Sequence, residues 1–248
     1  MAKSLRIGGY EVNQDYKTKL GGGSFSQVWR GRIVSTNEAI AVKEIQKPDD
    51  PEFTKKYIEQ EIKILKLASH PNIIKFYHDA WVGKVIFLFM EYCEERDLDQ
   101  FIKINKKLSE DVMLHFMQGV ADAIDYLHHL STPIIHRDLK PANLLVKKTY
   151  GNHLIKVADF SVSHPVTHDI TLLCGSSTYW APELLPDKNH RVKYNVEVDI
   201  FAMGVIFLAL ANHKTGHQLT PIKGTCNLSC HNTVFSSVRI LQENTFSH

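Results

Sequence analysis

Short stretches of alternating apolar and polar residues fill the first third of the chain, and this two-residue period is typical of half-buried β-strands. After a Pro-Asp-Asp-Pro break at 48–51, the residues Tyr57, Ile58, Ile62 and Leu65 recur at three- and four-residue spacing, which predicts a helix over 53–67. The strands that we predict in this part of the chain are 10–20, 27–33, 39–45, 73–81 and 84–92.

Helical periodicity takes over in the second part of the chain. It predicts a short helix at 97–103 and a longer one at 111–129, with Ser109 as N-cap and acidic residues in the first turn. An apolar run at 200–211 is too short to span a bilayer, so we expect a buried helix and no membrane span. A β-rich first part and a helical second part predict an α+β fold with two lobes, joined near residues 91–97.

Composition changes this picture little. With 44% hydrophobic and 23% charged residues, the 248-residue chain has the balance of an ordinary globular protein. Its 29 basic and 27 acidic residues leave a net charge of +2, which does not predict binding to nucleic acid. Four scattered cysteines do not suggest a disulfide framework, and the first residues lack the apolar stretch of a secretory signal. We therefore expect an intracellular, cytoplasmic setting.

One short polar loop carries the strongest chemical signal. Because it lies between the apolar pair Ile134-Ile135 and the apolar run 144–146, we expect its polar groups to be held rigidly. Phosphoryl transfer needs a carboxylate to orient a hydroxyl, a cation on the moving phosphoryl group and an amide oxygen on a metal ion. A plain polar loop between strands is the less favoured alternative. The loop reads His136-Arg137-Asp138-Leu139-Lys140-Pro141-Ala142-Asn143.

A glycine-rich turn at 20–28 lies between two predicted strands. Glycines allow a backbone to approach phosphates closely, although such a turn alone is more often only a turn. A dinucleotide-binding motif would need a helix to follow, and a P-loop would need Gly-Lys-Ser/Thr, which is missing from this sequence.

Two further positions carry charges in informative places. Lys43 lies on an apolar strand and Glu61 on the following helix, so an ion pair between them could hold the ammonium over phosphates; two unrelated surface charges are the alternative. Asp159 follows a predicted strand at 155–158, and with Asn143 it would offer oxygen ligands to Mg²⁺, although a lone Asp there is more often a turn residue. The 159–183 segment is a long loop, and such loops are usually functional or mobile.

Taken together and in this order, the motifs resemble those of the eukaryotic protein kinase superfamily, over roughly residues 10–211. The resemblance implies a protein-kinase-like bilobal fold. It places an N-terminal tail at 1–9, the N-lobe at 10–92, an incomplete C-lobe at 93–211 and an irregular tail at 212–248. It also implies transfer of the γ-phosphoryl group of ATP, with Mg²⁺, to Ser or Thr hydroxyls of a protein substrate.

The resemblance further implies roles for single residues. Lys140 and the 174–183 stretch resemble the serine/threonine branch, with Ser176 meeting Asp138 and Lys140, and Asp199 anchoring the loop. Thr171, then Thr167, are the candidate phosphorylation sites, because Arg137 could meet a phosphate there. No subfamily is implied. The implied catalytic residues are Asp138, Lys140, Lys43 and Glu61. The implied metal ligands are Asn143 and Asp159. The implied nucleotide contacts are Leu20, Gly21, Gly23, Val28, Ala41, Lys43, Glu91, Cys93, Asp97 and Leu145.

Two departures from the family pattern favour a second hypothesis. Ser161 replaces the glycine expected after Asp159-Phe160, and a Cβ there would cost roughly 1–3 kcal/mol if the position needs positive φ or a peptide flip. We therefore expect a shifted equilibrium between active and inactive loop states. Only 37 mostly polar residues follow Ala211 (248 − 211), so we expect a truncated form whose 200–211 helix is left uncovered as an apolar patch. The alternative is then a catalytically weak or inactive truncated kinase that acts as a nucleotide-binding or interaction module.

The 226–231 Cys/His cluster could bind zinc, but free thiols are the favoured interpretation.

Overall fold

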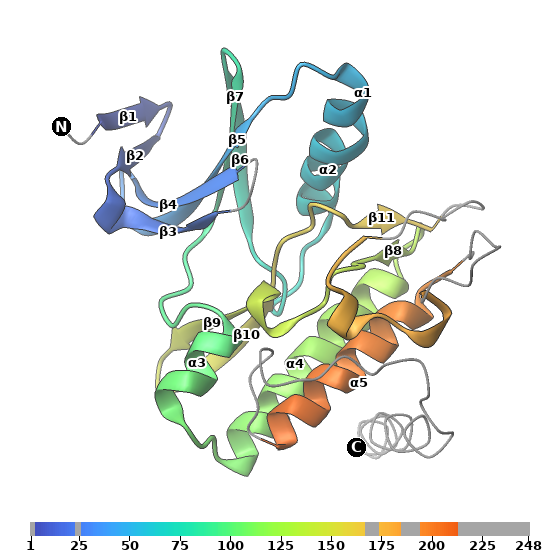
Figure 1. The fold of residues 1–248 in the computed structure, drawn as a ribbon. Coiled ribbons are helices and arrows are strands. Elements are labelled where there is room, and N and C mark those ends of the chain that lie inside the picture. Colours follow the sequence, from blue (N-terminus) through green and yellow to red (C-terminus); the bar gives the residue numbers. More distant parts are fainter. Residues whose placement is uncertain (1–2, 23–25, 167–173, 185–193, 213–248) are drawn as a thin grey trace. The chain divides into compact units, whose positions relative to one another are not determined.

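The computed structural model describes residues 3–22, 26–166, 174–184 and 194–212 (Figure 1). The chain divides into two compact units, Met1–Glu94 and Glu95–His248. Each unit has its own secondary structure, as the change of periodicity along the sequence predicts.

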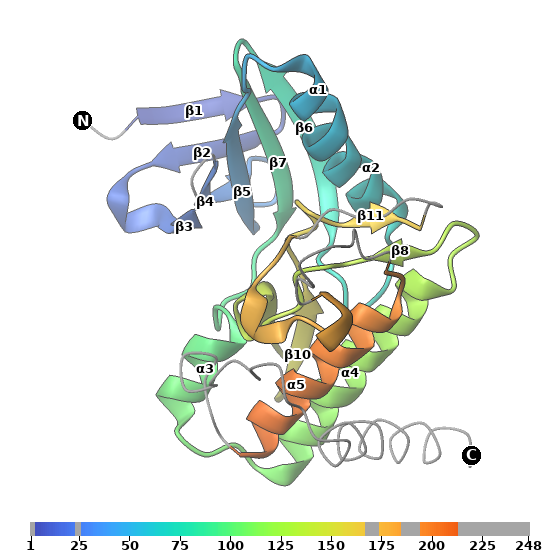
Figure 2. The ribbon, with the colours of Figure 1, turned by 45° about the vertical axis from the view of Figure 1, so that its right-hand side comes forward.

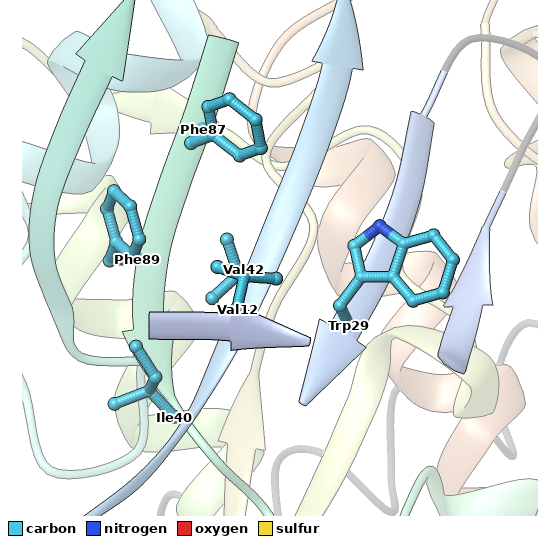
Figure 3. Packing of buried hydrophobic residues seen from close by; sticks show 6 residues of the cluster. All are labelled: Val12, Trp29, Ile40, Val42, Phe87 and Phe89. Atoms are coloured by element: carbon cyan, nitrogen blue, oxygen red, sulfur yellow. The ribbon is translucent and has the colours of Figure 1, made fainter. Parts of the chain in front are cut away.

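The first unit is built on an antiparallel sheet, with order β1-β2-β4-β5-β7-β6 and with β3 paired to β4. Alternate residues of these strands form an apolar cluster: Val12, Trp29, Ile40, Val42, Phe87 and Phe89 (Figure 3). This burial on alternate positions is the reason for the two-residue period of the sequence. The strands are β1 Lys3–Ile7, β2 Tyr10–Gln14, β3 Lys19–Gly22, β4 Ser26–Ile33, β5 Ala39–Gln46, β6 Phe76–Val82 and β7 Val85–Glu91.

The strands predicted at 27–33, 39–45 and 84–92 are confirmed within two residues, whereas two predictions near the N-terminus need correction. Residues 10–20 do not form one strand, because Asp15 accepts a hydrogen bond from the Lys17 N–H and starts a 3₁₀ turn at Tyr16–Thr18. Residues 3–7, predicted to belong to a tail, form β1 and pair with β2.

One continuous helical stretch follows β5. It consists of α1 Pro51–Phe53, a π-helical segment Thr54–Glu59 and α2 Gln60–Leu67. Asp50 caps its start by accepting a hydrogen bond from the Glu52 N–H, which explains why the helix begins two residues before the predicted position.

The second unit is mainly helical. Ser109 caps α4 as predicted, by accepting a hydrogen bond from the Val112 N–H. Figure 2 shows α5 lying along α4. Besides short 3₁₀ turns, the unit contains α3 Leu98–Asn105, α4 Glu110–His128 and α5 Glu197–Ala211, the hairpin of β9 Leu144–Thr149 with β10 Asn152–Val157, and the short pair β8 Ile134–Ile135 with β11 His164–Pro165.

The expected apolar patch on the last helix is not found in the described residues. Among the larger apolar side chains of α5, Leu208 is exposed, at 45%, and the others are buried or half-buried. The prediction that this helix is left uncovered as an apolar patch is therefore wrong. No helix within the described ranges has the length and apolar character needed to cross a membrane.

Candidate active site

The Asp138 carboxylate lies at the centre of a hydrogen-bonded group in the second unit. Its Oδ2 accepts hydrogen bonds from Lys140 Nζ at 2.7 Å and from Asn143 Nδ2 at 3.0 Å, and its Oδ1 accepts one from the Ser176 N–H at 2.8 Å. Lys140 Nζ also donates to Ser176 Oγ at 2.9 Å. The structure thus brings the acid, the cation and the amide of the loop into direct contact, together with the serine that the resemblance implied.

Gly175 allows this close approach of the 174–184 segment to the loop. It adopts φ +85°, and a Cβ at this position would lie 2.3 Å from the Arg137 carbonyl oxygen. Any side chain would therefore push Ser176 away from Asp138. Sequence reasoning did not identify this role, because a single glycine in a polar segment does not show which backbone it approaches.

Asp199, near the start of α5, holds the backbone that precedes Asp138. Its Oδ2 accepts the His136 N–H at 2.7 Å, and its Oδ1 accepts the Arg137 N–H at 2.9 Å. The ring Nε2 of His128 lies 3.0 Å from Oδ2. A buried carboxylate without partners would be costly, and these three groups satisfy it. His128 belongs to no motif that sequence reasoning recognised, since its role depends on a residue 71 positions away.

The two expected metal ligands lie on neighbouring backbone. The Ala158 N–H donates to the Asn143 carbonyl at 2.9 Å, which places the residue after it, Asp159, beside Asn143. Asn143 is buried and its amide nitrogen is used by Asp138, while its side-chain oxygen has no hydrogen-bond partner among the described residues. A buried amide oxygen and a carboxylate carried by neighbouring backbone are fitting oxygen ligands for a hard cation such as Mg²⁺.

The strain expected at Ser161 is not found. Asp159 itself adopts positive φ, +61°, whereas Ser161 does not adopt positive φ. A Cβ at residue 161 therefore carries no left-handed penalty in this conformation, and the shift between loop states stays a prediction.

In the first unit, Lys43 of β5 and Glu61 of α2 form the expected ion pair. Lys43 Nζ lies 2.6 Å from Glu61 Oε1, and the two side chains are only 12% and 4% exposed. The alternative of two unrelated surface charges is thus excluded.

The remaining expected nucleotide contacts are distributed over both units. Asp97 caps α3 through Gln100 and forms a β-bridge with Leu145 of β9. Gly23, both candidate phosphothreonines and the 226–231 cluster lie outside the described residues. The contacts that lie in the first unit are Leu20 and Gly21 of β3, Val28 of β4, Ala41 of β5, Glu91 of β7 and Cys93 just after β7.

A hollow lies beside the Asp138 carboxylate, and its lining includes Cys174, Ser176 and Tyr194. Burial raises the pKa of the Cys174 thiol, although the nearby Arg137 guanidinium opposes this effect. The hollow therefore contains a thiol that stays protonated at a pH where a free cysteine begins to ionise.

Cys174 is expected to react slowly with iodoacetamide at about pH 8. A raised pKa leaves a smaller thiolate fraction, and the thiolate is the nucleophile. Mass spectrometry of the Cys174 peptide should show slower alkylation in the folded protein than in the same chain unfolded in denaturant, and the difference should shrink as the pH rises. Faster alkylation in the folded protein would contradict the pKa direction.

Comparison with known proteins agrees with this geometry. The family model described as the protein kinase domain matches residues 15–247, which includes most of the segment expected to be an irregular tail. Serine/threonine-protein kinase atg1 of Dictyostelium discoideum is 34% identical over 81% of this chain and 30% of that protein. Serine/threonine-protein kinase ATG1a of Arabidopsis thaliana is 36% identical over 86% of this chain and 33% of that protein.

A relative with a different name is similar to the same degree. The probable serine/threonine-protein kinase MARK-A of Dictyostelium discoideum is 38% identical over 82% of this chain and 18% of that protein. The chain thus spans a third or less of the length of these relatives, and their names do not agree on a subfamily. What they share is the domain, and this chain belongs to the protein kinase family, in its serine/threonine branch.

Proposed function

We propose that this chain transfers the γ-phosphoryl group of ATP to Ser or Thr hydroxyls of a protein substrate. The observation that carries the proposal is the arrangement of Asp138, Lys140 and Ser176. Here one carboxylate and one ammonium are held together in a partly open site.

Asp138 would accept the hydrogen of the substrate hydroxyl. A carboxylate offers about four acceptor sites, and the described residues use three of them on Asp138. The remaining site is available to a hydroxyl. Lys140 is shared between Asp138 and Ser176, so its charge is positioned to stabilise the phosphoryl group as it moves.

The triphosphate would be held by Lys43, whose ammonium is oriented by Glu61. A Cβ at Gly21 would meet no atom within 4 Å, so packing within the fold does not require glycine there. A phosphate that approaches the backbone closely would require it. Leu20, Val28, Ala41, Glu91, Cys93, Asp97 and Leu145 would contact the adenosine part. Asn143 and Asp159 would bind Mg²⁺, which neutralises charge on the phosphates when it is bound.

The alternative of an inactive interaction module loses part of its support, because the described part of α5 carries no broad apolar patch and Ser161 does not adopt positive φ. The incomplete C-lobe that the sequence predicts still favours it. With each described catalytic position filled, turnover is the better supported function.

A transfer assay tests the proposal directly. The purified 248-residue chain is incubated with labelled ATP, Mg²⁺ and a generic acceptor protein, and its thermal unfolding is measured with and without ATP·Mg²⁺. We expect label on Ser and Thr of the acceptor and a higher midpoint with nucleotide. A raised midpoint without transfer would favour the interaction module. If the assay shows no transfer and no rise of the midpoint, the use of nucleotide is refuted.

A further inference from the structure

Among the described residues of the second unit, Arg96, Lys106, Arg137 and Asp159 have a positive φ, which non-glycine residues avoid, and two of the four lie at the proposed site. These two are Arg137, with φ +68°, and Asp159, with φ +61°. One precedes the proposed catalytic carboxylate, and the other is the proposed metal ligand. Because this conformation is unfavourable for a residue with a Cβ, surrounding contacts must hold both residues in place.

Besides the pairing of β8 with β11, three hydrogen bonds that involve a side chain tie the two strained segments to each other. The His136 ring Nε2 lies 3.0 Å from the Ala158 carbonyl oxygen. Arg137 Nε donates to the Val162 carbonyl. Ser163 Oγ donates to the His136 carbonyl at 3.0 Å. The bond from Ser163 is the one of the three in which the segment after Asp159 supplies the donating side chain.

The position of the Ser163 hydroxyl is well defined. The side chain is 3% exposed, and the Ser163 N–H donates to the Phe160 carbonyl at 3.0 Å, which closes a turn directly after Asp159. The His136 carbonyl that accepts from Ser163 belongs to a fully buried residue, so loss of the donor could not be replaced readily by water. Ser163 thus fixes the far end of the segment whose near end is held by the bond from Ala158 to Asn143.

We propose that Ser163 is a positioning residue for the metal-binding carboxylate, an inference that rests on the proposed function. By holding the 160–163 turn against the His136 carbonyl, it keeps Asp159 in its strained conformation beside Asn143. Without this bond the turn can relax, and Asp159 samples conformations in which its carboxylate no longer points to the metal.

The test measures metal affinity without turnover. Mn²⁺ replaces Mg²⁺, ADP is present in excess, and free Mn²⁺ is counted by electron paramagnetic resonance. For Ser163→Ala we expect the dissociation constant of Mn²⁺ to rise about tenfold, the size of effect that one buried hydrogen bond typically carries. Ser161→Ala removes a hydroxyl from the same turn, where the described residues show no side-chain hydrogen bond for it, and should stay within twofold of the wild type.

A second variant covers the case in which alanine prevents folding. Ser163→Cys keeps a side chain of similar size with a much weaker donor, so it should shift the Mn²⁺ dissociation constant in the same direction by a smaller factor. Thermal unfolding of each variant confirms that the compared proteins are folded.

The outcomes separate the two proposals. Unchanged Mn²⁺ affinity in a folded Ser163→Ala or Ser163→Cys protein overturns the role of Ser163, whatever the transfer assay shows. A tenfold weaker affinity in a chain that transfers no phosphoryl group supports Ser163 and counts against the proposed function alone. Equal loss in Ser161→Ala would also overturn the inference, because the effect would then belong to the turn in general.

Discussion

Replacement of Asp138 by alanine should lower kcat by roughly 10²–10⁴-fold, the contribution expected of a well-placed general base. The physical reason is that the substrate hydroxyl loses the one acceptor that orients it. Lys140, Asn143 and the Ser176 N–H lose their shared partner at the same time. The measurement is the initial rate of labelled phosphoryl transfer at saturating ATP and acceptor protein.

A surface carboxylate provides the matched control for this prediction. Asp122 lies on the exposed side of α4 and interacts with Gln118 of the same helix. Asp122→Ala should keep kcat within twofold. If Asp138→Ala retains more than about a tenth of the wild-type rate, Asp138 does not act as the base.

Replacement of Lys43 by methionine should affect both stability and turnover. It leaves the carboxylate of Glu61, 4% exposed, without its cation, and breaking a buried pair in this way costs about 3–5 kcal/mol of unfolding free energy. It also removes the ammonium that would hold the triphosphate, so transfer should be lost. Denaturant unfolding and the transfer assay measure the two effects separately.

The double variant Lys43→Met with Glu61→Leu separates these two roles. Because it removes the buried charge as well, most of the stability should return, while transfer should remain absent. Recovery of transfer in the double variant would show that Lys43 has no role beyond neutralising Glu61. The control is Lys84→Met, which breaks the fully exposed pair with Asp49 at 2.9 Å and should leave stability and turnover unchanged.

Local pattern predicted much of the secondary structure. The strands 27–33 and 39–45 and the long helix after Ser109 appear within two residues of the predicted bounds, because alternation, periodicity and capping act over a few neighbouring residues. The same approach failed for residues 3–7, where a short strand is stabilised by pairing with β2 and by packing on the apolar cluster rather than by its own pattern.

The prediction about α5 failed for a related reason. An apolar run shows that a helix needs cover, but not what lies against each face. In the structure the larger side chains other than Leu208 are covered at least in part. The positive φ considered for Ser161 lies two positions earlier in this conformation, at Asp159.

The sequence by itself determined the two-part organisation and the identity and order of the chemical groups, since these depend on residue type and near spacing. Only the tertiary structure decided which groups meet. The contacts of Ser163 with His136 and of His128 with Asp199 join residues 27 and 71 positions apart, and Gly175 matters only because the Arg137 carbonyl lies against it. Such contacts are set by how distant segments pack, so no local pattern records them.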